Sequence, residues 1–257
     1  MNERVALVTG ASRGIGRAAA IRLARDFGRV VVVARGEDGL AETAKAVEAH
    51  GAQAFRITAD LRDPKAAQMV LDRTLERFGV LDALVNIAGA VPQVDLFAMS
   101  DDEWNEGLSL KFHGARRLTL AAWPALRTRG GSVVLTSGTS AVVPKAAFAA
   151  VGAINAAIAC LAKAFSERGI EEGVQVNSVL PGPVMTARRR SMLEAYANLH
   201  HVSLEDGIKQ FAAESGIARY GESDDVAELI AFLVSPTARW FVGAAMRVDG
   251  GETKAVF

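Results

Sequence analysis

Short apolar runs recur along the chain and predict the strands of a buried sheet. Each run is rich in Val, Leu, Ile and Ala, is too short for a helix and is apolar at consecutive positions, which is typical of parallel strands covered on both faces. The predicted strands are residues 4–9, 29–34, 54–59, 81–86, 132–137, 175–180 and 244–248.

The segments between these runs have the apolar period of helices. Ala18, Ile21, Ala24 and Phe27 mark one helical face, and Ser100 and Ser223 each stand where a capping hydroxyl begins a helix. Strand and helix therefore alternate, which predicts a doubly wound α/β sheet of about seven parallel strands in a single domain, residues 1–257. The least regular segment is 186–216.

The composition of the chain reduces the number of possible functions and binding partners. The chain has 257 residues, and its 29 basic and 29 acidic side chains cancel, which disfavours nucleic acid and anionic membranes as partners. No uncharged apolar run reaches membrane-spanning length, and no leader precedes the first strand. The single cysteine, Cys160, excludes an internal disulfide, and no Cys/His spacing predicts a metal site. We expect a soluble, unprocessed cytoplasmic protein.

The first predicted strand runs into a glycine-rich turn. The sequence Thr9-Gly10-Ala11-Ser12-Arg13-Gly14-Ile15-Gly16 separates it from the first helix. Glycines there allow a tight turn and close approach of a pyrophosphate, whose charge the free N–H groups of the helix start can meet. The spacing G-x-x-x-G-x-G differs from that of most dinucleotide folds.

With this turn the chain resembles the short-chain dehydrogenase/reductase family, and the resemblance extends over nearly its whole length. Asp60 resembles the family's adenine-contacting Asp, and Asn86-Ile-Ala-Gly89 resembles its Asn-Asn-Ala-Gly. Pro181-Gly-Pro-Val-Met-Thr186 resembles the segment beside the nicotinamide, and Val248-Asp-Gly-Gly251 resembles the closing strand. The resemblance implies a Rossmann-like fold and the following cofactor-binding residues: Gly10, Ser12, Arg13, Gly14, Ile15, Gly16, Arg35, Asp60, Leu61, Asn86, Ala88, Gly89, Pro181, Gly182, Val184 and Thr186.

The end of the second predicted strand bears on the choice of coenzyme. An acidic residue there would hydrogen-bond the ribose diol of NAD, but the sequence reads Val33-Ala34-Arg35. Arg35 and Arg13 can instead form charge-assisted hydrogen bonds to a 2'-phosphate. We therefore expect NADP(H).

The catalytic residues depart from the family pattern. Family members use Ser, Tyr and Lys, usually with an Asn, and Ser137 matches the substrate-orienting serine. The expected Tyr-x-x-x-Lys is absent from the whole chain, and Val151-Gly-Ala-Ile-Asn155 stands in its place. The family's Asn lies seven residues after a Trp, and from Trp104 that count reaches Lys111. Lys thus stands where Asn is expected, and Asn155 stands where Lys is expected.

An exchanged pair could keep a Lys–Asn contact and move the charge. Lys111 is then the first candidate for the missing proton donor, because desolvation beside the nicotinamide would favour its neutral amine. Alternatively, Lys111 is a solvated lysine and Asn155 a decayed site. Tyr196 is a weaker candidate that requires a closing lid, and His113 is interpreted as structural.

The segment 186–216 corresponds to the family's substrate lid. It contains Arg188-Arg-Arg190, which could receive an acidic substrate such as an acyl carrier thioester or could simply be solvated. The apolar helices predicted at 101–127 and 146–167 favour a homo-dimer or homo-tetramer, with Cys160 packed in the second.

Two functions remain open at this point. The first is an NADP(H)-dependent oxidoreductase that interconverts a carbonyl and an alcohol of a small molecule, with Ser137, Lys111 and Asn155 as catalytic residues. The second is an NADP(H)-binding sensor or assembly protein without redox turnover. The cofactor turn does not separate them.

Overall fold

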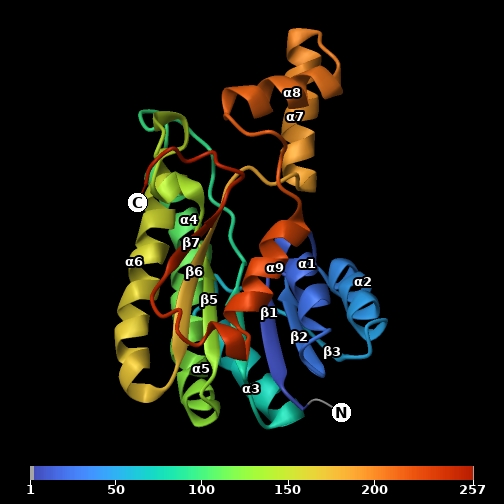
Figure 1. Ribbon diagram of the computed structural model, residues 1–257, viewed down its shortest axis with the longest axis vertical. Helices are drawn as coiled ribbons and strands as arrows, with labels where there is room; N and C mark the ends of the chain where they lie inside the picture. The colour runs from blue at the N-terminus through green and yellow to red at the C-terminus, as the bar shows by residue number, and fades with distance from the viewer. Residues whose placement is uncertain (1–2, 257) are drawn as a thin grey trace.

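A single twisted parallel sheet forms the centre of the computed structural model, which describes residues 3–256 apart from the side chain of Arg188. Its strand order is β3-β2-β1-β4-β5-β6-β7 (Figure 1). Every pairing between neighbouring strands is parallel. The strands are β1 (Val5–Thr9), β2 (Arg29–Ala34), β3 (Gln53–Thr58), β4 (Ala83–Asn86), β5 (Ser132–Thr136), β6 (Gln175–Pro181) and β7 (Ala245–Val248). These agree with the predicted strands to within two residues at either end.

Helices cover both faces of this sheet (Figure 1). One face packs against α1 (Gly14–Leu23), α2 (Glu37–Glu48) and α9 (Ser223–Leu233). The other packs against α3 (Ala66–Phe78), α5 (Ala115–Arg129) and α6 (Ala149–Glu172). A short α4 (Asp101–Gly107) continues into α5 through a π-helical segment, Leu108–Gly114.

The alternation of side chains along β1 explains why the predicted strands are apolar throughout. Ala6 and Val8 belong to the core on one face, whereas Val5 and Leu7 belong to the core on the other. All four are fully buried. Because helices exclude water from both faces of the sheet, every position of such a strand needs an apolar residue.

The segment predicted to be irregular is helical instead. It forms α7 (Ala187–His200) and α8 (Leu204–Glu214), which project from the body with a small apolar cluster of their own (Figure 1). We name this projecting pair of helices the lid, after the role that the family resemblance predicts for it. The Thr186 side chain caps α7, and that of Ser203 caps α8. Periodicity missed α7 because its apolar residues do not gather on one face, although Ala, Arg, Met, Leu and Glu are strong helix formers.

The structure tests two predicted helix caps. Ser100 caps α4 as predicted, with Glu103 completing the capping box. The prediction for Ser223 was wrong, because Ser223 is already the first helical residue of α9 and Glu222 is the N-cap. The Glu222 N–H donates to the Asp225 carboxylate at 2.8 Å, and these two acidic residues form a capping box without the expected hydroxyl.

The longest helix corrects two further expectations. By length and composition alone, the stretch Ala146–Glu172 is apolar enough to cross a membrane. Its inner face, which includes Ile154 and Ile158, is buried in the fold. Cys160 is exposed on this helix rather than packed, because its position faces away from the sheet.

Candidate functional site

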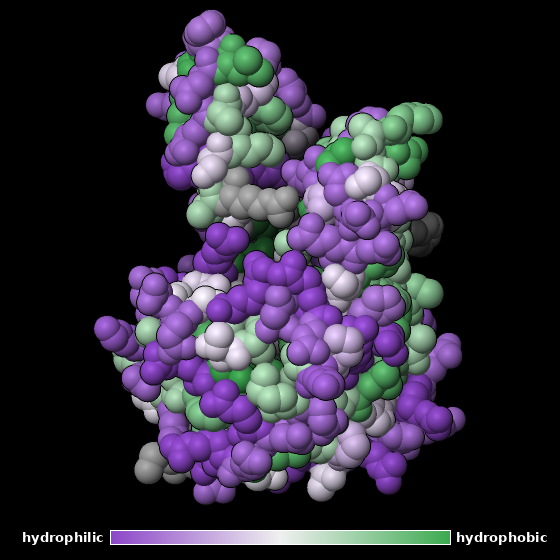
Figure 2. Space-filling view, turned by 180° about the vertical axis from the view of Figure 1, so that it is seen from behind, coloured by the Kyte–Doolittle hydropathy of each residue, from purple (hydrophilic) through white to green (hydrophobic). Residues whose placement is uncertain are grey.

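A cleft of about 860 Å³ opens at the carboxyl ends of the strands, over β1 and β4, where the strand order reverses. Such a switch point is where doubly wound sheets bind ligands. Figure 2 shows the surface hollowed where the lid meets the body, with strongly hydrophilic side chains beside the hollow. The cleft wall includes these predicted cofactor residues: Gly10, Ser12, Arg13, Gly14, Ile15, Gly16, Arg35, Leu61, Ala88, Gly89, Pro181 and Thr186.

The geometry of the first turn requires its glycines. Gly10 and Gly14 have φ angles of +68° and +55°, in the region that favours glycine. A Cβ on Gly16 would lie 2.2 Å from the carbonyl oxygen of Gly10, so only glycine allows the helix to begin this close to the strand. No side chain caps the start of α1. Its first N–H groups are therefore available to an anion in the cleft.

Four predicted cofactor residues do not line the cleft. The Asp60 carboxylate is held by the Arg62 guanidinium, at 2.7 Å for the shortest of their contacts. Hydrogen bonding from Arg62 lowers the pKa of Asp60. The other three residues serve the fold: Asn86 donates to the Thr119 hydroxyl at 3.1 Å, a Cβ on Gly182 would strike Asp249, and Val184 is buried in the core.

Other residues of the cleft wall were missed by motif matching. Most of them are adjacent in sequence to the motif residues and lie at the ends of strands. The predicted strand boundaries could therefore have identified them. They are Val33, Ala34, Gly36, Gly39, Ala59, Ile87, Ala90, Leu110, Thr136 and Ala187.

The charges around Arg35 favour an anionic ligand. Arg13 and Arg35 are exposed on the cleft wall, and neither forms an ion pair within the part of the chain that the structure describes. The carboxylate of Glu37, two residues beyond Arg35, is instead held by Arg56 at 2.8 Å and by the Thr58 hydroxyl at 2.7 Å. The Glu37 carboxylate is thus engaged by other side chains, and both guanidinium groups are placed to bind an anionic ligand.

Lys111 reaches the floor of the cleft from the π-helical segment between α4 and α5. Its stem lies over Gly89, where a Cβ would be 3.0 Å from the Cγ and Cδ atoms of Lys111. The Lys111 Nζ donates to the Ser137 carbonyl oxygen at 3.1 Å and to the Asn155 side-chain oxygen. The two residues whose types are exchanged relative to the family are therefore in direct contact. π-Helical segments are frequent at functional sites.

Asn155 connects Lys111 to the β5 end of the cleft. Asn155 is only 3% exposed, and its Nδ2 donates to the Ser140 hydroxyl at 2.8 Å. Because lysine has only donors, the amide oxygen must face Lys111 and the amide nitrogen must face Ser140. The Ser137 hydroxyl donates to the backbone carbonyl of Asn155 at 2.7 Å. Ser137 can accept a hydrogen bond from a ligand in this arrangement, but its proton is already committed.

The remaining candidates lie apart from this network. Tyr196 packs inside the lid against Phe211 and His200, with ring centroids 4.6 and 4.2 Å away, and it does not line the cleft. His113 is half-buried, and its Nδ1 has no partner among residues 3–256. Burial, followed by repulsion from neighbouring arginines, lowers its pKa. In the basic cluster of the lid, the side chain of Arg188 lies outside the described residues.

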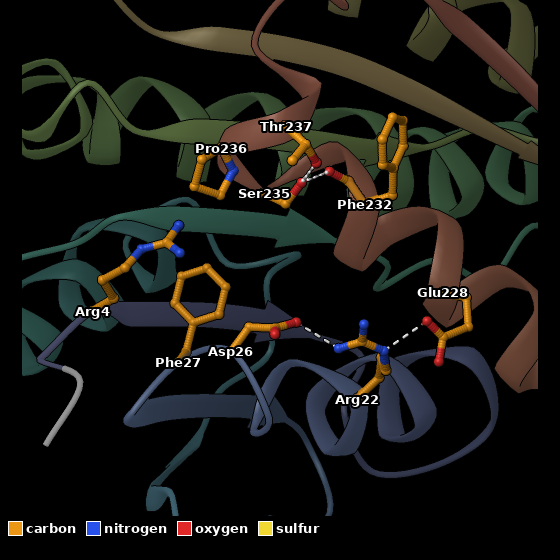
Figure 3. Close-up of a pocket in the computed structure, with 9 residues that line it drawn as sticks. All are labelled: Arg4, Arg22, Asp26, Phe27, Glu228, Phe232, Ser235, Pro236 and Thr237. Carbon is orange, nitrogen blue, oxygen red and sulfur yellow. Dashed lines mark hydrogen bonds and ion pairs between the residues drawn. The ribbon is translucent and has the colours of Figure 1, made fainter.

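A second hollow, of about 380 Å³, lies at the amino end of β1 and is drawn in Figure 3. Arg22 bridges Asp26 and Glu228, at 2.5 and 2.7 Å, and so joins α1 to α9. The Arg4 guanidinium lies over the ring of Phe27, 4.2 Å from its centre. The charged groups of this hollow are therefore engaged within the fold, and we interpret the hollow as a structural joint.

The family model described as enoyl-(acyl carrier protein) reductase matches residues 10–253. The chain is a short-chain dehydrogenase/reductase. A putative ketoacyl reductase of Streptomyces coelicolor is 33% identical to it over 256 residues, covering 97% of each chain. A 3-oxoacyl-(acyl-carrier-protein) reductase of Staphylococcus aureus is 32% identical over 249 residues, covering 96% of each.

Solved structures of other reductases have the same fold as this short-chain dehydrogenase/reductase. L-Sorbose reductase from Gluconobacter frateurii, complexed with NADPH and L-sorbose, superposes with a TM-score of 0.95 at 28% identity and covers 100% of this chain and 98% of its own. A variant of actinorhodin polyketide ketoreductase with NADPH superposes with a TM-score of 0.91 at 32% identity, covering 97% of each chain. These matches support the predicted seven-stranded Rossmann-like fold.

Proposed function

We propose that the protein is an NADP(H)-dependent oxidoreductase that interconverts a carbonyl and an alcohol through an altered proton relay. The observation that carries this proposal is the contact of Lys111, which lines the cleft beside Ser137, with Asn155, which is buried behind the cleft wall. A polar network at this position is costly to bury unless its groups are paired, and each of these side chains has a partner. The cleft thus keeps a polar centre although the usual tyrosine is absent.

The coenzyme proposal rests on the other end of the cleft. The glycine turn offers backbone N–H groups to a pyrophosphate, and Arg13 and Arg35 offer two guanidinium groups to a 2'-phosphate. The solved relatives named above carry NADPH. Asp60 takes no part in this proposal, since Arg62 holds its carboxylate.

When bound, the reduced nicotinamide supplies a hydride for the carbonyl carbon of the substrate. The protein must then stabilise and protonate the oxygen that receives the electron pair. Lys111 is the proposed donor: its ammonium passes a proton to the alkoxide and regains one from solvent, and the reverse applies to alcohol oxidation. Asn155 holds the Lys111 amine in place through its side-chain oxygen, and the lone pairs of Ser137 can accept a hydrogen bond from the alcohol product.

Loss of the tyrosine does not by itself remove catalysis. A positioned general acid contributes about 10² to 10⁴ in rate. Holding the reactants in attack geometry contributes about 7 to 11 kcal/mol, which is about 10⁵ to 10⁸ in rate. A cleft that still aligns coenzyme and carbonyl therefore retains the larger of the two contributions.

Two observations favour a second candidate, an NADP(H)-binding protein without turnover. The Ser137 hydroxyl donates to a backbone carbonyl, and Val151 occupies the place where the family carries its tyrosine. Both features weaken the substrate side of the cleft while leaving the coenzyme side intact. In that case the coenzyme would act as a ligand that stabilises the fold or an assembly.

Coenzyme binding followed by a substrate panel tests the proposal. Titration with NADPH and NADH should show tighter binding of NADPH, and mixing the NADPH complex with ketones, aldehydes and β-ketoacyl thioesters should consume the reduced coenzyme with at least one class. Tight NADPH binding without consumption by any class would support the second candidate. Failure to bind either coenzyme would exclude both.

A further inference from the structure

Gly138 lies between Ser137 and the short 3-10 helix Thr139–Ala141, directly beside the Lys111–Asn155 pair. Its backbone is extended, with φ 167° and ψ 158°, a conformation open to any residue. The need for glycine here therefore does not come from the backbone.

The reason for glycine is the space that its missing side chain leaves. A Cβ on Gly138 would lie 2.6 Å from the Asn155 Nδ2 and 3.4 Å from the Asn155 Cγ. The next nearest atom, the Pro181 carbonyl oxygen, would be 3.7 Å away, at ordinary van der Waals distance. Among the residues that the structure describes, the only serious conflict is thus with the amide group of Asn155.

The Cβ would collide with an amide whose oxygen and nitrogen both form hydrogen bonds. Its oxygen accepts from Lys111 and its nitrogen donates to Ser140. Asn155 is buried, so a displaced amide would lose both partners without gaining water in their place. The Lys111 amine would then lose one of the acceptors that stabilise its charged form, while the Ser137 carbonyl oxygen remains.

We propose that Gly138 is a positioning residue, which by lacking a side chain leaves the space in which Asn155 orients the amine of Lys111. The role of Gly138 in turnover rests on the function proposed above, whereas its effect on the Lys111 amine does not. Gly138 makes no contact with a reacting atom in this proposal and acts through Asn155 alone.

The substitution Gly138→Ala tests this directly, with Gly221→Ala as the matched control. A Cβ on Gly221 meets nothing closer than 3.6 Å. Competitive acetylation of the folded proteins, quantified by mass spectrometry with the other lysines as internal references, reports the state of each amine. Lys111 should be acetylated about tenfold faster in Gly138→Ala than in the wild type, which is the change expected from one lost charge-assisted hydrogen bond. The control should react as the wild type does.

The same substitution in an Asn155→Ala background separates positioning from general damage. Shortening residue 155 removes the atoms that the new Cβ would strike, so Gly138→Ala should then leave the acetylation rate of Lys111 unchanged within about twofold. An equal effect of Gly138→Ala in both backgrounds, or none in the wild-type background, would overturn the proposal.

Measurement of turnover tests the role of Gly138 independently. If the proposed function holds, kcat should fall in Gly138→Ala while the dissociation constant of NADPH changes by less than about threefold. If the proposed function fails and no carbonyl is reduced, the acetylation experiment still supports or overturns the role of Gly138. Circular dichroism and thermal unfolding establish that each variant is folded before labelling.

Discussion

Substitution of Arg35 by alanine tests the coenzyme assignment most informatively. The guanidinium is exposed at the edge of the cleft, and within residues 3–256 it forms no ion pair, although its charge helps to lower the pKa of Asp60. A hydrogen bond to a charged partner contributes about 1.5 to 3 kcal/mol, and solvent exposure reduces this contribution. We therefore expect Arg35→Ala to cost about 1 to 2 kcal/mol in NADPH binding, which weakens it about 5- to 30-fold.

The binding of NADH provides the internal comparison. NADH lacks the 2'-phosphate, so its dissociation constant should change by less than about twofold in Arg35→Ala. Calorimetry or nicotinamide fluorescence measures both constants, with Arg25→Ala, an exposed arginine outside the cleft, as the control. Equal weakening of both coenzymes would show that Arg35 does not contact a 2'-phosphate. A wild-type preference for NADH would refute the reasoning outright.

Three further predictions concern chemistry, pH dependence and assembly. Lys111→Met should lower kcat by about 10² or more while leaving NADPH binding within about threefold, as measured by stopped-flow absorbance; an unchanged kcat would remove the lysine from the relay. Because burial lowers the pKa of His113 in the folded state, the unfolded chain binds that proton first, and stability should decline as pH falls below about 6.5. Urea unfolding across pH 7 to 5 should show a flatter profile for His113→Phe, and identical slopes would contradict the assignment. Leu120 on α5 is 50% exposed. If the long apolar helices form a subunit interface, Leu120→Glu should lower the molecular mass measured by light scattering. A wild-type protein that is already monomeric would exclude that interface.

The fold was predictable because its signals are local. Strands buried on both faces must be apolar at every position, so β1 and β2 stand out from composition alone. The glycine turn was equally clear, since a positive φ at Gly10 and the close approach at Gly16 each require glycine. The lid helix α7 escaped detection because it lacks a one-sided apolar face.

The site was only partly predictable because its contacts join distant segments. Counting from motifs identified Lys111 and Asn155 as an exchanged pair, and the structure brings their side chains into contact. No spacing rule could reveal that Arg62 holds the carboxylate of Asp60, or that the Ser137 hydroxyl donates to a backbone carbonyl. Which of several nearby groups a side chain bonds depends on side-chain geometry, and the residue types alone do not specify that geometry.

We propose that this cleft transfers a hydride from NADPH to a carbonyl carbon although the family's tyrosine is absent. Single-turnover reaction of the protein with NADPH deuterated on the transferred position, followed by mass spectrometry of the product, measures this transfer directly. We expect an alcohol carrying one deuterium on its carbinol carbon, formed much more slowly by Lys111→Met. Tightly bound NADPH that stays reduced, with no labelled alcohol from any carbonyl offered, would contradict it.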